Sequence, residues 1–349
     1  MKVVLIVGNR PQVIRSAPLA LALRAAGMTE ALLVIGLPDV EPANTLLREL
    51  EVVAPSHELR LDDGRTDWMV LSIAETLFGE DPDIVLVSGD SQSTLAGARA
   101  AVEAGILLAH VEAGVRSGDR ETADELTRVE VDNTADWLFC PDEHAASRLR
   151  AEGVRGEIEV VGDAMLDAVR RFADVVHRRY PPLHAGPYVL ATVQRQANRE
   201  DPRLSRILEA LNRLRCRVIV VAGPRGRSAV RAADVNIMRH VVLIDPLPYF
   251  EFTSLMSNAH AVVTDSGVLQ REAYWHGVPC VTLRKSTEWP DTVSVGANVL
   301  VDCDPDAIEA AVHDPRVPER RPNVLGDGKA SMRIARTLAT SLRSQGVPA

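Results

Sequence analysis

Short apolar runs alternate with amphipathic stretches of helix length along the whole chain, and this alternation constrains the fold more than any other feature. Strands that are apolar throughout are typical of a parallel sheet covered by helices on both faces. Because the runs form two successive series, they predict an α/β protein with two doubly wound domains. The runs lie at 3–7, 84–87, 107–111, 137–140 and 158–162, and then at 188–193, 217–222, 240–244, 261–264, 278–283 and 298–301.

The boundary between the two series falls at 168–187, where a predicted helix leads into a connector rich in proline and glycine. The chain has 349 residues, which suits two domains of ordinary size. We therefore predict an N-terminal Rossmann-like domain at 1–168 and a C-terminal Rossmann-like domain at 169–328. A final helix is expected at about 329–343, after the turn sequence LGDG.

The net charge of −9 argues against nucleic acid as a partner. An anionic small molecule remains compatible with this charge if cationic side chains gather locally. Lysine occurs only as Lys2, Lys285 and Lys329, so arginine carries most of the positive charge. Arginine suits the recognition of phosphate oxygens because its guanidinium donates two parallel hydrogen bonds.

No apolar stretch reaches the length of about 18 residues that a membrane span requires, so no membrane partner is expected. The apolar run in MKVVLIVGNR is short and leads directly into a motif, which favours a buried first strand over a signal sequence. The cysteines lie far apart and form no CxxC pair, which argues against structural zinc and a disulfide framework. The predicted location is the reducing cytoplasm.

Open α/β sheets bind ligands at the carboxyl ends of their strands, so the residues that follow each strand are the functional candidates. After the first strand, Gly8 suits a tight turn and Pro11 suits a helix start. Amide groups at such a helix start favour an anion, and Arg10 and Arg15 add positive charge. The alternative is an ordinary strand–helix turn with solvated arginines.

The second domain repeats this pattern at Thr264-Asp265-Ser266-Gly267. Ser266 can cap the following helix and donate to a phosphate. Glu272 lies in the first turns of that helix, where its carboxylate could accept both hydroxyls of a ribose. The alternative is a capped helix with a solvated glutamate. Two such helix starts would suit a diphosphate that links two groups, as in a nucleotide-sugar.

Acidic residues follow the strands of the first domain. Asp90 ends VLVSGD, Glu112 lies in HVEAG, and Asp124 and Glu125 lie at a predicted helix start one turn before Arg128. Carboxylates that share one site can transfer protons, and their mutual repulsion raises the pKa of some of them. The alternative is an N-cap role for Asp90 and Asp124 and a salt bridge for Glu112. His110 and His276 are expected to be core or surface residues rather than catalysts.

Long motifs in matching order resemble those of the UDP-N-acetylglucosamine 2-epimerases, and the resemblance spans nearly the whole chain. GNRPQVIRSAP is similar to the family's G-T-R-P-E-x-I-K-x-x-P, and HVEAGVRSGD is nearly the family's own string. The segment that starts TDSGVLQREA is similar to T-D-S-G-G-x-Q-E-E-A and its tail. The further similar segments are VSGDSQSTLAG, DELTR and LGDGKASMRIA.

The resemblance implies a GT-B-type fold with two Rossmann-like domains and the active site in the cleft between them. The first domain would be completed by the C-terminal helix at about 329–349. The family's reaction needs no nicotinamide and no metal. UDP is expelled by anti elimination across C1–C2, which gives a 2-acetamidoglucal, and UDP adds back after C2 is reprotonated on the opposite face. Family members of this sort are commonly homodimers, so a homodimer is expected.

Matching positions assign the site residues that the resemblance implies. Asp90, Glu112 and Asp124 form the acid/base group and Arg128 orients it, while Gln194 takes the place of a family histidine. Arg15 takes the position of a family lysine. The residues expected to bind the UDP-sugar are Arg10, Arg15, Arg195, Ser266, Gly267, Val268, Glu272 and Arg284.

Several residues of the family's active-site motifs are replaced in this chain. Gln194 cannot become cationic as histidine can, so stabilisation of the leaving UDP should weaken unless Arg195 compensates. Ala197 replaces a glutamate, Val268 replaces the second glycine of S-G-G, and Gln12 replaces a glutamate of the first motif. The region 36–50 has no counterpart of the family's Q-H-R-E-M segment, so activation by allosteric substrate is not expected.

Three functions stay open at this point. The first is a non-hydrolysing epimerase that interconverts UDP-GlcNAc and UDP-ManNAc. The second is another reaction of a UDP-sugar on the same scaffold, either hydrolytic epimerisation or transfer of the sugar to an acceptor. The third is a non-catalytic nucleotide-sugar binder, against which the retention of Asp90, Glu112 and Arg128 argues.

Overall fold

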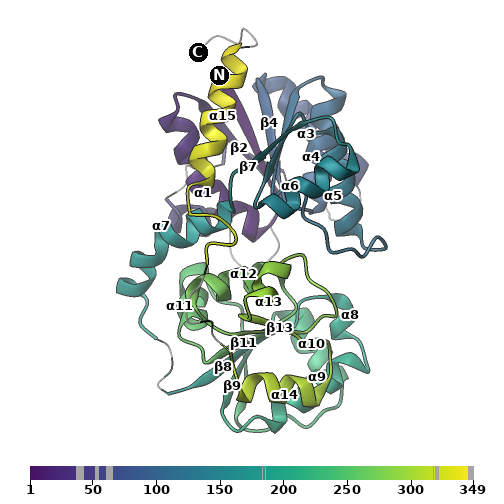
Figure 1. Ribbon diagram of the computed structural model, residues 1–349, viewed down its shortest axis with the longest axis vertical. Coiled ribbons are helices and arrows are strands. Elements are labelled where there is room, and N and C mark those ends of the chain that lie inside the picture. Colours follow the sequence, from purple (N-terminus) through teal and green to yellow (C-terminus); the bar gives the residue numbers. More distant parts are fainter. Residues whose placement is uncertain are drawn as a thin grey trace. The chain divides into compact units, whose positions relative to one another are not determined.

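The computed structural model describes residues 1–36, 43–51, 55–59, 66–182, 184, 186–316, 318 and 322–344 (Figure 1). The chain divides into two compact units. The first unit comprises Met1–Phe172 and Leu325–Ala349, and the second unit comprises Ala173–Val324. The sequence predicted the division at residue 168, and in the structure it falls within the helix α7 (Ala164–Arg179).

The first unit is built on a seven-stranded parallel sheet in the order β3-β2-β1-β4-β5-β6-β7. This order reverses direction between β1 and β4, which is the switch point where open α/β sheets bind ligands. Its strands are β1 (Lys2–Val7), β2 (Thr29–Ile35), β3 (His57–Leu59), β4 (Ile84–Ser88), β5 (Leu107–Val111), β6 (Trp137–Cys140) and β7 (Glu157–Val160).

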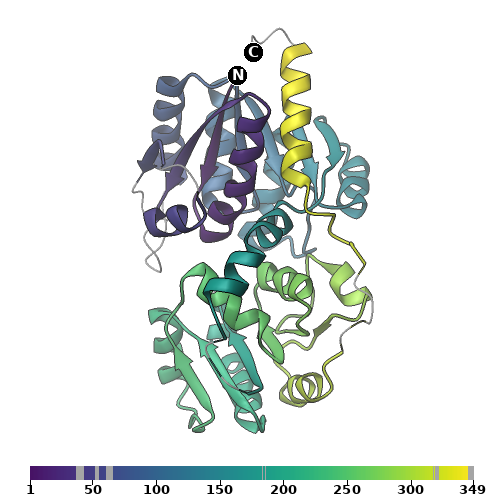
Figure 2. The same cartoon turned by 90° about the vertical axis from the view of Figure 1, so that its left-hand side faces the viewer.

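Helices connect the parallel strands of the first unit, as parallel pairing requires. The last helix, α15, packs against α1 within this unit, and both views show it in yellow beside the sheet (Figures 1 and 2). The helices are α1 (Arg10–Ala25), α2 (Ala43–Glu49), α3 (Thr66–Glu80), α4 (Gln92–Glu103), α5 (Ala123–Thr134), α6 (Glu143–Glu152), α7 and α15 (Ala330–Ser344).

The second unit repeats the arrangement with a six-stranded parallel sheet in the order β10-β9-β8-β11-β12-β13, so its switch point lies between β8 and β11. The strands are β8 (Tyr188–Thr192), β9 (Arg217–Val221), β10 (Val241–Ile244), β11 (Ala261–Thr264), β12 (Cys280–Thr282) and β13 (Asn298–Leu300). The helices are α8 (Gln196–Arg199), α9 (Arg203–Arg213), α10 (Pro224–Ala232), α11 (Tyr249–Ser257), α12 (Gly267–His276), α13 (Pro290–Ser294) and α14 (Pro305–His313).

The prediction of two doubly wound parallel sheets is confirmed, and every predicted apolar run forms a strand. Two strands of the first sheet were missed. β3 has only three residues, HEL, none of them fully buried, so it carries no apolar signal. β2 reads TEALLVI, and its buried half pairs with β1 along the register Val4↔Ala31 to Val7↔Val34. Its Ala-Leu-Leu stretch is equally compatible with a helix, which only the pairing with β1 resolves.

Apolar side chains fill both faces of each sheet. In the first unit, Val4 and Ile6 of β1 belong to one core cluster with Val85 and Val87 of β4. In the second unit, separate clusters lie around Val189 and around other strand residues such as Leu190 and Val262. Within the described ranges, no helix is both long and apolar enough to cross a membrane.

Candidate active site

The predicted acidic residues of the first unit follow adjacent parallel strands. Asp90 comes after β4 and Glu112 comes directly after β5, so both lie at the carboxyl edge of the sheet. Burial raises the pKa of the Asp90 carboxyl above its ordinary value, and the negative charges of Asp124 and Glu112 add to this rise, while Arg128 opposes it. The charges of Asp124, Glu112 and Arg128 thus act on Asp90.

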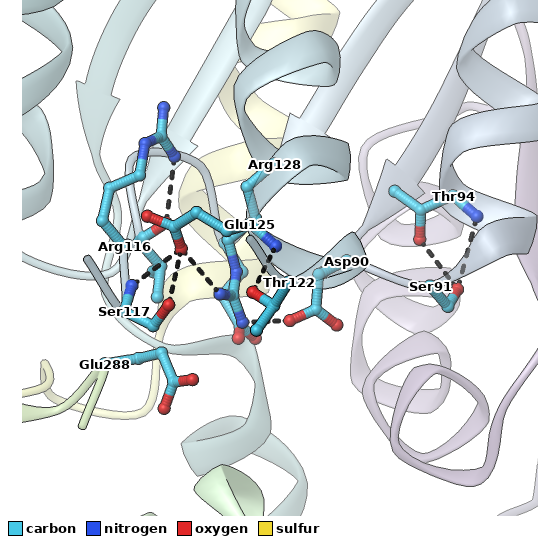
Figure 3. A network of polar contacts seen from close by, with 12 residues as sticks. Asp90, Ser91, Thr94, Arg116, Ser117, Thr122, Glu125, Arg128 and Glu288 are labelled. Carbon is cyan, nitrogen blue, oxygen red and sulfur yellow. Dashed lines mark hydrogen bonds and ion pairs between the residues drawn. The ribbon is translucent and has the colours of Figure 1, made fainter. Parts of the chain in front are cut away.

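Arg128 joins two of the acidic residues. Its Nη2 forms an ion pair with Asp90, and its Nη1 lies 3.3 Å from Oε2 of Glu125 (Figure 3). The guanidinium is nearly buried, whereas 31% of the Asp90 side chain is exposed. Arg128 therefore holds the Asp90 carboxylate from the protein side and leaves part of it accessible.

Glu125 also belongs to this site. The sequence placed it at the start of a helix, but it was not included in the predicted acid/base group. Its buried carboxylate accepts hydrogen bonds from the amide of Ser117 at 2.8 Å, the hydroxyl of Ser117 at 2.9 Å and the amide of Gly118 at 3.2 Å. Burial alone would raise the pKa of Glu125, but these bonds and Arg128 lower it below the ordinary value. The Thr122-x-x-Glu125 spacing is that of a capping box, yet the carboxylate binds the preceding loop instead.

The structure also tests the alternative interpretation of Asp90 and Asp124, in which each carboxylate caps the N-terminus of a helix. The N-cap of α4 is Ser91, and the N-cap of α5 is Thr122, whose hydroxyl accepts from the amide of Glu125. Both cap interpretations are therefore wrong. Asp124 is exposed in the first turn of α5.

Glu112 forms a salt bridge, which was the alternative interpretation of this residue. Its Oε2 pairs with Nη1 of Arg15, and only 10% of the Glu112 side chain is exposed. The Glu112 backbone has φ +73°, a left-handed conformation that costs a residue with a side chain about 1–3 kcal/mol. Such strain at the end of a strand is characteristic of functional sites, and here it belongs to a predicted catalytic residue.

The turn after β1 differs from its prediction. Gly8 is not left-handed; it is required because a Cβ there would lie 2.1 Å from Oγ of Ser93. The amide of Gly8 donates to Oε1 of Gln12, and Asn9 caps the amide of Gln12. These amides at the start of α1 are therefore already engaged, contrary to the expectation of free anion-binding groups. Arg10 is the first residue of α1.

Gln12 ties this turn to the loop that carries Asp90. Its buried amide nitrogen donates to the carbonyl of Ser88 at 2.6 Å and to the hydroxyls of Ser91 and Thr94 at 2.8 Å each. A glutamate, which the family motif has here, could not donate to a carbonyl. Glutamine therefore fits the hydrogen-bond partners that this chain presents.

A cavity of about 330 Å³ opens at the carboxyl edge of the first sheet. Its position between the ends of β1 and β2 and the start of α4 is where the doubly wound fold binds ligands. The described residues that line it are Gly8, Ile35, Met69, Ser91, Gln92 and Ser93.

In the second unit, Ser266 caps α12 as predicted, because its hydroxyl accepts from the amide of Leu269. The neighbouring Asp265 was not predicted to act at the site. Its fully buried carboxylate accepts from the amides of Gln194 and Arg195, each at 2.9 Å. Asp265 thus fixes the backbone of Gln194, predicted in the catalytic group, and of Arg195, predicted to bind UDP. The side chain of Gln194 is exposed.

Glu272 is buried rather than solvated, so that alternative is wrong. Its Oε1 accepts from the hydroxyl of Tyr249 at 3.3 Å. A Cβ at Gly267 would make a tight contact, at 3.2 Å from Nε1 of Trp289. Val268 follows it in the first turn of α12 and is partly exposed.

Arg284 forms a two-pronged pair with Glu288, with N–O distances of 2.6 and 2.9 Å. Arg195 reaches the same carboxylate at 3.4 Å. Glu288 is nearly buried and therefore organises two arginines that the sequence assigned to UDP. Glu288 lies in the segment STEWP, which matches the T-E-R/W-P-E tail of the family motif, but the predicted site set did not include it.

The region 36–50, whose sequence excludes the family's allosteric segment, lies partly outside the described residues. The other predicted site residues are all described. Within the first unit the structure brings together Asp90, Glu112, Arg15 and Arg128, and within the second unit it brings together Gln194, Arg195, Ser266 and Arg284 around Asp265 and Glu288.

Comparison with known proteins gives the family. The model of the family described as UDP-N-acetylglucosamine 2-epimerase matches residues 23–339. The chain belongs to the UDP-N-acetylglucosamine 2-epimerase family. It is therefore an isomerase of the nucleotide-sugar 2-epimerase type with Rossmann-like domains of the GT-B class, as the sequence predicted.

Individual relatives of this epimerase family agree over the full length. The UDP-2,3-diacetamido-2,3-dideoxy-D-glucuronate 2-epimerase of Pseudomonas aeruginosa is 34% identical, over 97% of this chain and 99% of its own length. A UDP-N-acetylglucosamine 2-epimerase homolog of Methanococcus maripaludis is 35% identical with the same coverage. The UDP-GlcNAc 2-epimerase of Methanocaldococcus jannaschii, solved with UDP-GlcNAc and UDP, has a TM-score of 0.88 at 31% identity, covering 97% of this chain and 100% of its own.

Proposed function

We propose that this chain is a non-hydrolysing 2-epimerase that interconverts UDP-GlcNAc and UDP-ManNAc. The observation that carries the proposal is the pair of carboxylates at the ends of β4 and β5, each matched with an arginine. Asp90 pairs with Arg128 and Glu112 pairs with Arg15. Family membership and the M. jannaschii relative that was solved with UDP-GlcNAc support the substrate class.

The reaction requires a base at C2 and a stabilised leaving group at C1. A carboxylate removes the C2 proton, the C1–C2 double bond forms, and UDP departs with the electron pair of the C1–O bond. Protonation of C2 on the opposite face and return of UDP to C1 then give the epimer. The raised pKa of Asp90 suits proton transfer nearer to neutral pH than an ordinary aspartate would allow. Glu112 and Asp124 supply the further carboxylates that protonation of C2 on the opposite face of the sugar needs.

The proposal assigns UDP binding mainly to the second unit. The capped start of α12 presents amides to an anion, and the Ser266 hydroxyl is close to them. Glu272 is assigned to the ribose hydroxyls, and Arg195 and Arg284 stabilise the charge that develops on the departing diphosphate. Arg10 and Arg15 of the first unit keep their predicted role as UDP contacts.

A second substrate is favoured by one specific comparison. The P. aeruginosa relative, which is 34% identical, is named for UDP-2,3-diacetamido-2,3-dideoxy-D-glucuronate. That sugar retains the 2-acetamido group and the C2 proton, so the same elimination and re-addition apply to it. The replacements at Gln194, Ala197 and Val268 are departures from the general family pattern that a different sugar would explain.

Incubation in heavy water distinguishes these reactions. With UDP-GlcNAc, we expect deuterium at C2 and the appearance of UDP-ManNAc by NMR. Free sugar with UDP would instead indicate hydrolytic epimerisation, and unchanged UDP-GlcNAc together with exchange in the diacetamido glucuronate would identify the second substrate. Binding of UDP without exchange in either sugar would contradict the proposed epimerase function.

We also propose that the chain is a homodimer that associates through α3 and α4. These helices pack against each other in the first unit, and their outer faces carry several exposed apolar side chains. Exposed apolar patches of this kind mark association surfaces. The residues and their exposed fractions are Trp68 at 54%, Leu71 at 64%, Phe78 at 91% and Val102 at 49%.

The mass of the particle in solution tests this assembly. Phe78→Glu should shift it from dimer to monomer in light-scattering chromatography, because a charge would be buried without a partner. The matched control is Met238→Glu, which changes a half-exposed apolar side chain that belongs to neither α3 nor α4. A monomeric wild type, or a Phe78→Glu variant that stays dimeric, would exclude this surface.

A further inference from the structure

A buried polar cluster lies directly behind the carboxylates, and the proposed chemistry does not use it. It consists of His110 on β5, Asp132 on α5 and Arg116 in the loop between them. His110 and Asp132 are fully buried. Groups of this polarity are expensive to bury, so their place in the core calls for a function beyond packing.

Both nitrogens of His110 face acceptors. Nε2 lies 2.9 Å from the carbonyl oxygen of Gly89, which can only accept. Nδ1 lies 2.7 Å from Oδ1 of Asp132. Burial would raise the pKa of Asp132, but His110 and Arg116 lower it below its ordinary value, so this carboxylate is ionised and also only accepts. Both ring nitrogens therefore contact oxygens that accept hydrogen bonds.

Each end of this pair holds the backbone beside a predicted catalytic carboxylate. Gly89, whose carbonyl accepts from His110, immediately precedes Asp90 and has a left-handed φ of +72°. Gly114, whose amide donates to Oδ2 of Asp132 at 3.1 Å, follows Glu112 by two residues and has φ +76°. These are the turns that direct the two carboxylates away from the ends of β4 and β5.

The remaining contacts tie the cluster to further segments of the first unit. Arg116 donates from Nη1 to Oδ2 of Asp132 at 2.7 Å. Its other guanidinium nitrogens bind Glu152 of α6 at 3.2 and 2.7 Å. These bonds join β5, α5, α6 and the loops after β4 and β5 within the first unit. A buried hydrogen-bond network of this kind specifies one arrangement of the chain.

We propose that His110 and Asp132 are positioning residues of the epimerase, which set the relative placement of Asp90 and Glu112 through the backbones of Gly89 and Gly114. Neither residue touches the substrate. The inference rests on the proposed function, because it concerns the residues assigned to proton transfer there. Displacement of a reacting group by about 1 Å from a distant substitution can reduce a rate by about 100-fold.

Two variants of His110 separate its two contacts. The amide nitrogen of asparagine can replace Nδ1 and keep the bond to Asp132, but it cannot reach the carbonyl of Gly89. The amide nitrogen of glutamine can replace Nε2 and keep the bond to Gly89. We expect His110→Asn to lower kcat by about 100-fold with KM changed by less than about threefold, because UDP binding is untouched. His110→Gln should recover at least about tenfold of this loss.

The assay is NMR detection of C2 deuterium exchange with the sugar that the wild type accepts, together with UDP affinity by calorimetry and thermal unfolding. His144→Asn is the matched control, because His144 is exposed on α6 and its removal should leave kcat unchanged. Wild-type kcat in His110→Asn would overturn the proposal, as would equal losses in the asparagine and glutamine variants.

A structural readout keeps this test separate from the proposed function. If the wild type exchanges no UDP-sugar, the proposed function fails, but crystal structures of the two variants still decide the positioning. We expect the backbone of Asp90 to move by about 1 Å in His110→Asn and to stay in place in His110→Gln. If the backbone of Asp90 has the same position in the wild type and in His110→Asn, the inference is overturned.

Discussion

Replacing Glu125 by glutamine tests whether this carboxylate supports the Asp90–Arg128 pair. Oε2 of Glu125 accepts two bonds from Ser117 and one from Arg128, and Oε1 accepts the amide of Gly118 at 3.2 Å. Glutamine has one oxygen and one amino group. With its oxygen in the Oε2 position, three bonds remain, and the amino group then faces the amide of Gly118 as donor against donor.

The expected cost comes from two losses. A backbone amide left without its acceptor costs about 1–3 kcal/mol. The bonds that remain are no longer assisted by a negative charge, which roughly halves their strength, and Arg128 loses its ion pair with residue 125. We therefore expect the free energy of unfolding to fall by about 3 kcal/mol at neutral pH, or roughly 6–12 °C in Tm for a unit of this size.

Thermal unfolding as a function of pH is the assay. The pKa of Glu125 is lower in the folded protein than in the unfolded chain, so its charge stabilises the fold at pH values above the ordinary value of 4.5. This contribution is lost as the pH falls through the lower folded pKa. The difference between wild type and Glu125→Gln should thus be largest at neutral pH and shrink below pH 4.5.

Glu121→Gln is the control, because Glu121 lies exposed just before α5 and its substitution should change Tm by less than about 1 °C. The reasoning is refuted if Glu125→Gln costs less than about 1 kcal/mol at neutral pH. It is also refuted if the difference between the two proteins does not diminish in acid.

Three further predictions concern the remaining site residues. Asp90→Asn should lower kcat for C2 exchange by about 100-fold or more, and the acidic limb of the wild-type pH–rate profile should lie above the ordinary aspartate pKa because the pKa of Asp90 is raised; an unchanged rate contradicts its assigned role. Gln12→Glu should destabilise the first unit by about 1–3 kcal/mol in denaturant unfolding, because a carboxylate would face the Ser88 carbonyl; equal stability would show that the loop adapts. Gln194→His should raise turnover of UDP-GlcNAc by restoring a cationic side chain, and equal or lower turnover counts against that sugar as substrate.

The second unit shows how local sequence can be sufficient for part of a site. A serine after a buried strand and before a helical stretch predicts an N-cap, and Ser266 is one. The same rule misled at α5, where Asp124 was considered as the cap and Thr122 holds that position. Both residues are acceptable caps, and the choice between them depends on where the preceding loop leaves the backbone.

The organisation of the site around its buried carboxylates could not be predicted in the same way. Arg128 and Asp90 are separated by 38 residues, Arg15 and Glu112 by 97, and Gln194 and Asp265 by 71. A sequence pattern reports contacts within a few residues, whereas these bonds exist only because parallel strands bring distant loops to one edge. Asp265 was overlooked for this reason, because its partners Gln194 and Arg195 lie about 70 residues away.

By itself, the sequence determined the two series of buried strands, the family and the identity of the chemical groups, since continuous apolar runs and long motifs are properties of neighbouring residues. Only the tertiary structure decided which carboxylate pairs with which arginine, which acids are buried, and that His110 and Asp132 link the turns beside Asp90 and Glu112. The physical reason is that hydrogen-bond partners and burial depend on distances through space, which the order of residues along the chain does not contain.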